Sequence, residues 1–144
     1  MNKNDKRNAR IFALKMAYAY EMTKNNDSLS DNINIESESD DFSEEILNYG
    51  KALVDIYIEN IQDFDKQIVS KSSNWDISRI AFIDRIIIRL ALSEMFYIDD
   101  VPEKVSIVEA VEIAKLYSTD DSSSFINGIL DSIYNEKIKT NKSC

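Results

Sequence analysis

Four basic residues near the start of the chain have a spacing that suits phosphate binding. They are Lys3, Lys6, Arg7 and Arg10, and separations of three or four residues place them along neighbouring rows of one helix side. Ammonium and guanidinium groups form strong charge-assisted hydrogen bonds with phosphate, and such contacts dominate the affinity of proteins for nucleic acids. The same side chains could equally be solvated surface charges, and charge alone does not separate the two interpretations.

The charge of the chain is unevenly distributed. The formal net charge is −9, yet residues 1–24 carry six basic and two acidic residues, a net of +4. Residues 25–65 carry twelve acidic residues and one basic residue, a net of −11. A basic end on an acidic body can orient a polyanion and repel it from the other faces.

The residues needed for most enzymatic and metal chemistry are missing from the sequence. There is no histidine, and the only cysteine is Cys144. Histidine-based nucleophile systems and zinc sites are thereby excluded. The two glycines, Gly50 and Gly128, lie far apart, so no glycine-rich phosphate loop can form. We expect a protein that is not an enzyme and has neither metal nor cofactor.

The sequence also indicates where the protein works. The most apolar stretch, residues 80–97, contains Asp84, Arg85, Arg89 and Glu94, which a bilayer core would disfavour. The basic N-terminus has no apolar signal core. A single cysteine fits a reducing compartment. We therefore expect a cytoplasmic protein without a membrane partner.

The pattern of apolar residues predicts an all-α fold in a single domain covering residues 1–144. The chain has 144 residues with only two glycines and one proline, too few for a many-stranded fold, and its apolar residues recur at helical spacing. An acidic, mobile loop is expected at about residues 25–41. The expected helices span about Asn4 or Asp5 to Lys24, Asp41 to Val69, Asp76 to Ile98, Ser106 to Tyr117, and 122–138.

Helix ends and close contacts can be predicted from single residues. Asn4 is the expected N-cap of the first helix, Ser106 and Glu109 fit a capping box, and Asp121 or Ser122 should cap the last helix. Both glycines lie within helical patterns, where glycine is costly, so close helix packing is expected at each. Residues 76–98 are apolar nearly all round and should form the centre of the bundle, with Trp75 filling the core beside them.

The first helix carries two apolar rows. Ala9, Phe12, Ala13, Met16 and Tyr20 form one row, and the second consists of Ile11, Leu14 and Tyr18. The second row either packs internally, which we favour, or meets a partner.

Several segments, in order along nearly the whole chain, resemble the NusB family. The most specific is Phe-Ile-Asn-Gly-Ile-Leu-Asp at residues 125–131, preceded by Val-Ser-Ile-Val-Glu-Ala-Val-Glu-Ile-Ala-Lys at residues 105–115 and by Asp121 and Ser122. Three weaker patches agree: Ala9 and Arg10 with Tyr18, Trp75 with Arg79, and Asp84 through Arg89 to Glu94.

The resemblance implies both a fold and a function. The implied fold is a compact all-α bundle of about seven helices in two small subdomains. The implied function is transcription antitermination. The protein would bind boxA-type single-stranded RNA together with NusE, a small-subunit ribosomal protein. It would thereby join the transcription elongation complex, contacting RNA polymerase indirectly, and support ribosomal RNA transcription.

The resemblance also implies site residues. Cations would bind phosphates, exposed aromatic rings would stack on bases, and free amides at a helix start near residues 121–125 would bind an anion. The residues so assigned to RNA are Lys3, Lys6, Arg7, Arg10, Tyr18, Asp121 and Phe125. Tyr18 and Asp84 are assigned to the surface that binds the protein partner. For Phe125 the alternative is a place in the core, which is common for aromatic residues at helical spacing.

Three departures from the family pattern qualify this expectation. Asn8 and Ser124 stand where the family usually has basic residues, and Val108 replaces a usual asparagine. Fewer cations weaken phosphate binding, so we expect weak RNA affinity without NusE. One rival interpretation is an acidic protein–protein interaction module without RNA binding. Another is a domain separated from an RNA cytosine methyltransferase, since similar domains occur fused to such enzymes.

Overall fold

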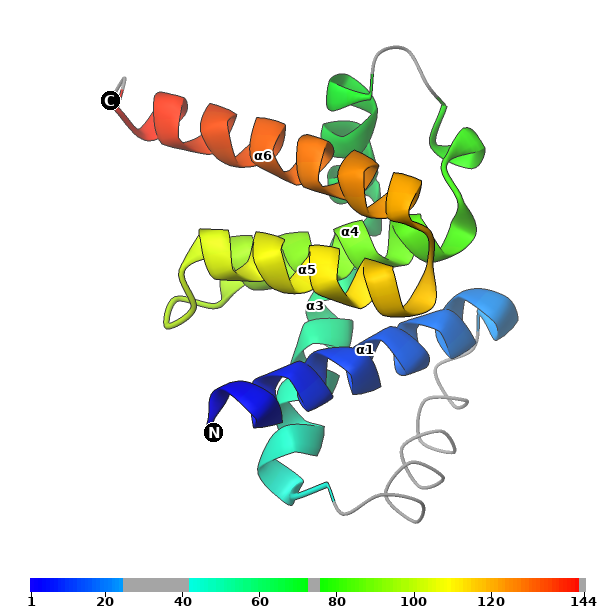
Figure 1. The fold of residues 1–144 in the computed structure, drawn as a ribbon, viewed down its shortest axis with the longest axis vertical. Helices are drawn as coiled ribbons and strands as arrows, with labels where there is room; N and C mark the ends of the chain where they lie inside the picture. Colours follow the sequence, from blue (N-terminus) through cyan, green and yellow to red (C-terminus); the bar gives the residue numbers. More distant parts are fainter. Residues whose placement is uncertain (25–41, 73–75, 143–144) are drawn as a thin grey trace. The chain divides into compact units, whose positions relative to one another are not determined.

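The structure is a computed structural model that describes residues 1–24, 42–72 and 76–142. The expected acidic loop at 25–41 and Trp75 lie outside these residues. The described part is all-α, as predicted, with five helices where about seven were expected for the fold, one 3-10 turn and no strand (Figure 1). Its elements are α1 (Lys3–Thr23), α3 (Glu44–Lys71), η1 (Ile77–Arg79), α4 (Phe82–Tyr97), α5 (Glu103–Tyr117) and α6 (Asp120–Lys142).

The chain divides into two compact units, in keeping with the two subdomains expected. The N-terminal unit is Met1–Glu59 and the C-terminal unit is Asn60–Cys144. The boundary falls inside α3, where Asn60 has non-helical angles of φ −123° and ψ 16°. The helix predicted from Asp41 to Val69 is therefore kinked at this residue.

In the N-terminal unit, α1 begins two residues earlier than the expected cap allows. Asn2, not Asn4, is the N-cap, because the Asp5 backbone N–H donates to Asn2 Oδ1 at 2.8 Å. The Asn2 backbone N–H in turn donates to Asp5 Oδ2 at 3.3 Å, which completes a reciprocal capping box. The helix ends at Lys24, which has left-handed angles of φ 52° and ψ 33°.

The core of this unit contains the predicted first row of α1 and the buried face of α3. Ala9, Phe12, Ala13 and Met16 are fully buried, and Tyr20 is half-buried. The predicted close packing at Gly50 is confirmed. A Cβ atom built there would lie 2.8 Å from Phe12 Cδ2 and 2.9 Å from the carbonyl oxygen of Ala9.

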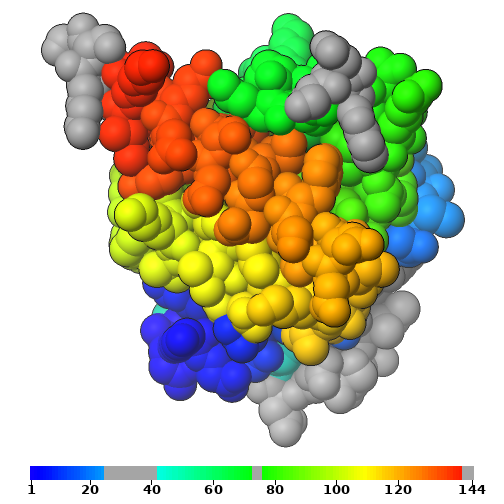
Figure 2. All heavy atoms as spheres, turned by 45° about the horizontal axis from the view of Figure 1, so that its top comes forward, coloured from blue at the N-terminus to red at the C-terminus, as the bar shows by residue number. Residues whose placement is uncertain are grey.

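In the C-terminal unit, α4 is the central helix, as predicted. It contacts both α5 and α6, which lie side by side on one face of the unit (Figures 1 and 2). Residues from every turn of α4 are buried, including Ile86, Ile88 and Leu92, which are completely inaccessible to solvent. The expected helix from Asp76 is divided, because η1 precedes α4 as a separate turn.

Three local predictions in this unit are wrong. The helix with Ser106 begins at Glu103, after Pro102 as N-cap, so Ser106 lies inside it and donates to Glu94 Oε1 at 2.6 Å. The last helix begins at Asp120, with the Ser122 N–H donating to Thr119 Oγ1 at 3.0 Å, so Thr119 occupies the capping position.

The third wrong prediction is close helix packing at Gly128. This residue is exposed, and a Cβ atom there would have no neighbour within 4 Å, so no packing contact explains this glycine.

Within the described ranges, no helix combines the length and the hydropathy that a membrane span requires.

Candidate RNA interface

The basic row of α1 is only partly accessible. Lys3 is exposed, Lys6 and Arg7 are half-buried, and Arg10 is 8 % exposed. The capping box at Asn2 fixes the first turn, so the three accessible cations project from an ordered helix start. In this conformation Arg10 offers little surface to a ligand, because the side of α1 that carries it also carries the buried Ala13 and Ala17. Its contact with RNA stays a prediction.

The second apolar row of α1 is not buried uniformly. Leu14 is 3 % exposed, Ile11 is half-buried and Tyr18 is 43 % exposed. Internal packing therefore holds for Leu14, whereas much of the Tyr18 side chain is accessible to a partner or a base. The exposure of Tyr18 is compatible with its assignment to RNA and to the protein partner. That assignment stays a prediction.

The start of α6 does not offer the free amides that were expected between residues 121 and 125. The Ser122 N–H donates to Thr119 Oγ1 at 3.0 Å, and the Ser123 N–H donates to the Thr119 carbonyl oxygen at 3.0 Å. Asp120 and Asp121 lie in the first turn, where their carboxylates already complement the helix dipole. An anion site formed by backbone amides is therefore wrong for Ser122 and Ser123.

The two α6 side chains assigned to RNA differ in exposure. Asp121 is exposed and Phe125 is half-buried, one turn further along the same helix side. A half-buried ring can be held by the protein on one side and still present an edge or a face to a ligand. This position agrees with neither a fully buried core residue nor a fully solvated one.

Asp84 has an internal contact. It is 4 % exposed, and its Oδ1 accepts a hydrogen bond from Ser118 Oγ at 2.8 Å. The bond connects the first turn of α4 to the residue that ends α5. Asp84 thus positions the C-terminal end of α5, and direct contact with a protein partner stays a prediction.

Sequence reasoning missed two accessible residues on α1. Lys15 is exposed, and Met22 is 62 % exposed. They lie three residues before and four residues after Tyr18, so helical spacing was a sufficient signal to place all three on one side.

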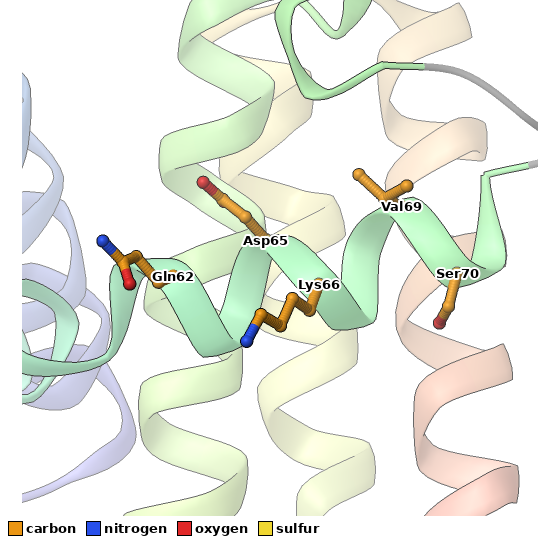
Figure 3. Close-up of a pocket in the computed structure, with 5 residues that line it drawn as sticks. All are labelled: Gln62, Asp65, Lys66, Val69 and Ser70. Carbon is orange, nitrogen blue, oxygen red and sulfur yellow. The ribbon is translucent and has the colours of Figure 1, made fainter.

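A shallow hollow on α3 is the strongest alternative as a ligand site. Its volume is about 520 Å³, and its described lining residues are Gln62, Asp65, Lys66, Val69 and Ser70 (Figure 3). All come from one helix, and the Asp65 carboxylate is already paired with Arg89 at 2.8 Å. Such a surface lacks the converging polar groups of a small-molecule site. Among the residues described, no group of three side chains could hold a metal ion.

Comparison with known proteins places the chain in a family. Residues 7–135 match the family model described as NusB. The chain is 45 % identical over 137 residues to the transcription antitermination protein NusB of Chloroherpeton thalassium, a match that covers 91 % of this chain and 62 % of that protein. It is 39 % identical over 146 residues to the protein of the same name from Thermodesulfovibrio yellowstonii, covering 96 % and 97 % of the two chains.

Solved structures share the fold. The structure of T. maritima NusB is 31 % identical with a TM-score of 0.78, and the match covers 91 % of each chain. A crystal structure of the antitermination factors NusB and NusE in complex with dsRNA contains a chain that is 21 % identical with a TM-score of 0.81. That match covers 94 % of this chain and 99 % of the other, and at this identity it shows the fold alone.

The family model covers residues 7–135, and the Thermodesulfovibrio relative is matched over nearly its full length. Relatives that are named antitermination proteins also agree with the expectation that the chain is not an enzyme. The all-helical fold and the segments at residues 105–115 and 125–131 thus have one common explanation, which is that the chain belongs to the NusB family.

Proposed function

We propose that this chain is a cytoplasmic transcription antitermination factor that binds boxA-type single-stranded RNA together with NusE. In this role it joins the transcription elongation complex and supports ribosomal RNA transcription. The observation that carries the proposal is the ordered, cationic start of α1, with Lys3, Lys6 and Arg7 accessible, in a chain of the NusB family.

The electrostatics of α1 support RNA rather than a basic protein as the ligand of this helix. The start of α1 carries Lys3, Lys6 and Arg7, and the one acidic residue of its first turn, Asp5, is held in the capping box with Asn2. The strongly acidic composition of residues 25–65 disfavours binding of a polyanion to that stretch of the sequence. The cations of α1 would thus attract RNA, and the acidic residues would repel it.

NusE is proposed as the partner because a structural neighbour of the same fold was solved with it. That complex contains dsRNA, so the preference for a single strand and for boxA is part of our proposal. The absence of basic residues at positions 8 and 124 leaves few cations for phosphate. NusE would supply the remaining contacts, and the RNA affinity of the isolated chain would be low.

The first prediction tests the cations of α1 through the salt dependence of binding. Changing Lys3, Lys6 and Arg7 together to alanine should flatten the plot of log K against log salt concentration by about 2, since each phosphate contact on a single strand contributes ~0.7. The measurement is a salt titration of boxA-type RNA with the chain and NusE present.

The matched control removes the same charge from other places. Lys51, Lys66 and Lys104 are exposed on α3 and α5, and their triple alanine variant should leave the slope unchanged. Equal slopes for the two triple variants would show that α1 does not hold the phosphates. If the unmodified chain binds NusE but no RNA at any salt concentration, the protein–protein interaction module becomes the better description.

The second prediction concerns Phe125. Replacing it with leucine keeps apolar volume in the half-buried site but removes the stacking surface, so RNA binding should weaken about 10-fold while the Tm changes by only a few degrees. The affinity is measured with NusE present, and the Tm by circular dichroism. Tyr117→Leu, at an exposed aromatic residue on α5, is the control and should bind RNA normally. A large fall in Tm with unchanged RNA affinity would assign Phe125 to the core.

A further inference from the structure

The kink in α3 lies where the chain passes from one compact unit to the other. Asn60 has φ −123° and ψ 16° inside this helix, and the units divide between Glu59 and Asn60. Sharp kinks arise at proline or glycine, or where a side chain disturbs the hydrogen bonds of the helix. The helix contains no proline, and its only glycine, Gly50, is ten residues before the kink. The side chain of Asn60 and its contacts are therefore the best explanation of the kink.

Tyr97, the last residue of α4, contacts α3 at this kink. Its Oη donates a hydrogen bond to Asn60 Oδ1 at 2.9 Å. Its ring lies edge-on to the Phe64 ring, with the centroids 6.3 Å apart and an interplanar angle of 67°. Phe64 is 2 % exposed and lies one turn after Asn60. Tyr97 thus contacts the first turn of α3 beyond the kink at two points, both within the C-terminal unit.

The hydrogen bond from Tyr97 favours the kinked form of α3 over a continuous helix. Asparagine is a poor helix former, because its side-chain amide competes with the backbone for hydrogen bonds. In this structure the amide oxygen of Asn60 accepts from the Tyr97 hydroxyl instead. The net contribution of one hydrogen bond corresponds to a ratio of about 5 in the populations of two forms. The loss of one hydroxyl is therefore enough to change the balance between them.

The residues that we assign to RNA belong to both units. Lys3, Lys6 and Arg7 are in the N-terminal unit and Phe125 is in the C-terminal unit, and the backbone passes from one unit to the other inside α3. An RNA strand that binds both sets of residues requires a defined angle in α3. If the binding-competent form is only partly populated, the observed affinity falls in proportion.

Tyr97 lies away from the RNA-binding residue of its own unit. Lys137 Nζ donates to the carbonyl oxygen of Met95 at 3.2 Å, so the end of α4 lies beside Lys137 on α6. Phe125 is twelve residues earlier in α6, or about 18 Å along the helix axis. An effect of Tyr97 on a base held at Phe125 would therefore be indirect.

We propose that the Tyr97–Asn60 hydrogen bond holds α3 in its kinked form and thereby positions the RNA-binding residues of the two units for one strand. Tyr97 and Asn60 are positioning residues, and neither contacts the RNA. Their effect on RNA rests on the proposed function, whereas their effect on the kink does not.

Spin labels on the two halves of α3 test the kink directly. Lys51→Cys and Lys66→Cys, at exposed positions on either side of the kink, carry the labels in a chain with Cys144→Ser. In a continuous helix the two Cα atoms would be about 22 Å apart, which pulsed EPR can measure. Tyr97→Phe keeps the ring and removes the hydroxyl, so the distance distribution should broaden towards the value of the continuous helix. Tyr117→Phe, at an exposed tyrosine of α5, is the control and should leave the distribution unchanged.

The effect on RNA is measured with boxA-type RNA and NusE present. Tyr97→Phe should weaken binding about 5-fold with an unchanged salt slope, since every phosphate contact remains. Asn60→Ala favours the continuous helix and should weaken binding at least as much, and the double variant should be no weaker than Asn60→Ala, because both changes remove one hydrogen bond. In a chain that carries Phe125→Leu, Tyr97→Phe should have little further effect. Tyr117→Phe should bind RNA normally.

The outcomes distinguish this inference from the proposed function. If Tyr97→Phe leaves both the distance distribution and the RNA affinity unchanged, the inference is wrong and the proposed function stands. If it changes the distances but not the affinity, the kink does not position the RNA-binding residues, which also overturns the inference. An equal loss with and without Phe125→Leu would show that Tyr97 does not act by joining the two units. If the unmodified chain binds no RNA, the proposed function fails together with the positioning role, and the distances alone decide whether Tyr97 holds the kink.

Discussion

Replacing Asp65 with alanine is expected to lower the free energy of unfolding by about 3 kcal/mol, because it removes the carboxylate that pairs with a buried arginine. Arg89 Nε lies 2.8 Å from Asp65 Oδ1, and Arg89 Nη2 lies 2.9 Å from Asp65 Oδ2, a two-point contact between α3 and α4. The Arg89 side chain is 6 % exposed and that of Asp65 is 23 % exposed. The guanidinium therefore stays largely desolvated when the carboxylate is lost.

The neighbouring residue provides a matched control. Lys66 follows Asp65 in α3, is exposed and points to a different side of the helix (Figure 3). Lys66→Ala also removes one charge from α3, and it should change the free energy of unfolding by less than about 0.5 kcal/mol. Stability is measured by urea denaturation monitored by circular dichroism. Similar midpoints for the two variants would show that the Arg89 pair contributes little.

Replacing both members of the pair tests the stated cause. Asp65→Leu combined with Arg89→Met removes both charges and keeps apolar volume, so it should be less destabilising than Asp65→Ala alone. A double variant that is less stable than the single one would mean that the pair itself, rather than the loss of one of its two members, accounts for the fall in stability.

The helical class of the fold and the buried apolar row of each helix were predictable from the sequence because they depend on periodicity. The buried row of α1 and the central position of α4 follow from where apolar residues recur, which the chain specifies locally. The role of Ser106 could not be predicted from periodicity or spacing. Ser106 and Glu109 have capping-box spacing, yet Ser106 donates to Glu94 on α4 and the helix begins three residues earlier. No local pattern identifies a hydrogen-bond partner twelve residues away.

The helix caps carry a local sequence signal. Asn2 precedes Asp5 by three residues, and this asparagine–aspartate pair forms the same reciprocal hydrogen bonds as the familiar serine–glutamate pair. Thr119 also precedes Ser122 by three residues, and its Oγ1 accepts a hydrogen bond from the Ser122 backbone N–H. In both cases the capping residue lies at least two positions before the expected one.

Accessibility within the candidate site was the least predictable feature. The spacing of Lys3, Lys6, Arg7 and Arg10 places them on one side of a helix, but burial depends on which elements pack against that side. Arg10 is buried and Lys15, outside the predicted cluster, is exposed. A helical wheel gives the angle between side chains, whereas the tertiary structure decides which angles face solvent.

The two glycines also differ in their tertiary surroundings, so replacing each of them with valine is expected to have opposite effects on stability. Gly50→Val should lower the free energy of unfolding by about 3 kcal/mol, at the upper end of overpacking costs. A single added Cβ would already lie 2.9 Å from the Ala9 carbonyl oxygen, a backbone atom that can move only if α1 moves. The two further methyl groups of valine add to this clash, and the corresponding fall in Tm is roughly 10 °C.

Gly128→Val is the matched control, because the residue, the replacement and the helical setting are the same. Nothing lies within 4 Å of a Cβ atom at Gly128, and valine is slightly better than glycine in a helix, so the Tm should stay the same or rise slightly. Thermal unfolding of both variants under one buffer condition measures the contrast. If the two variants lose stability equally, valine acts through the backbone alone, and the close approach of α1 to α3 at Gly50 contributes nothing to the choice of glycine there.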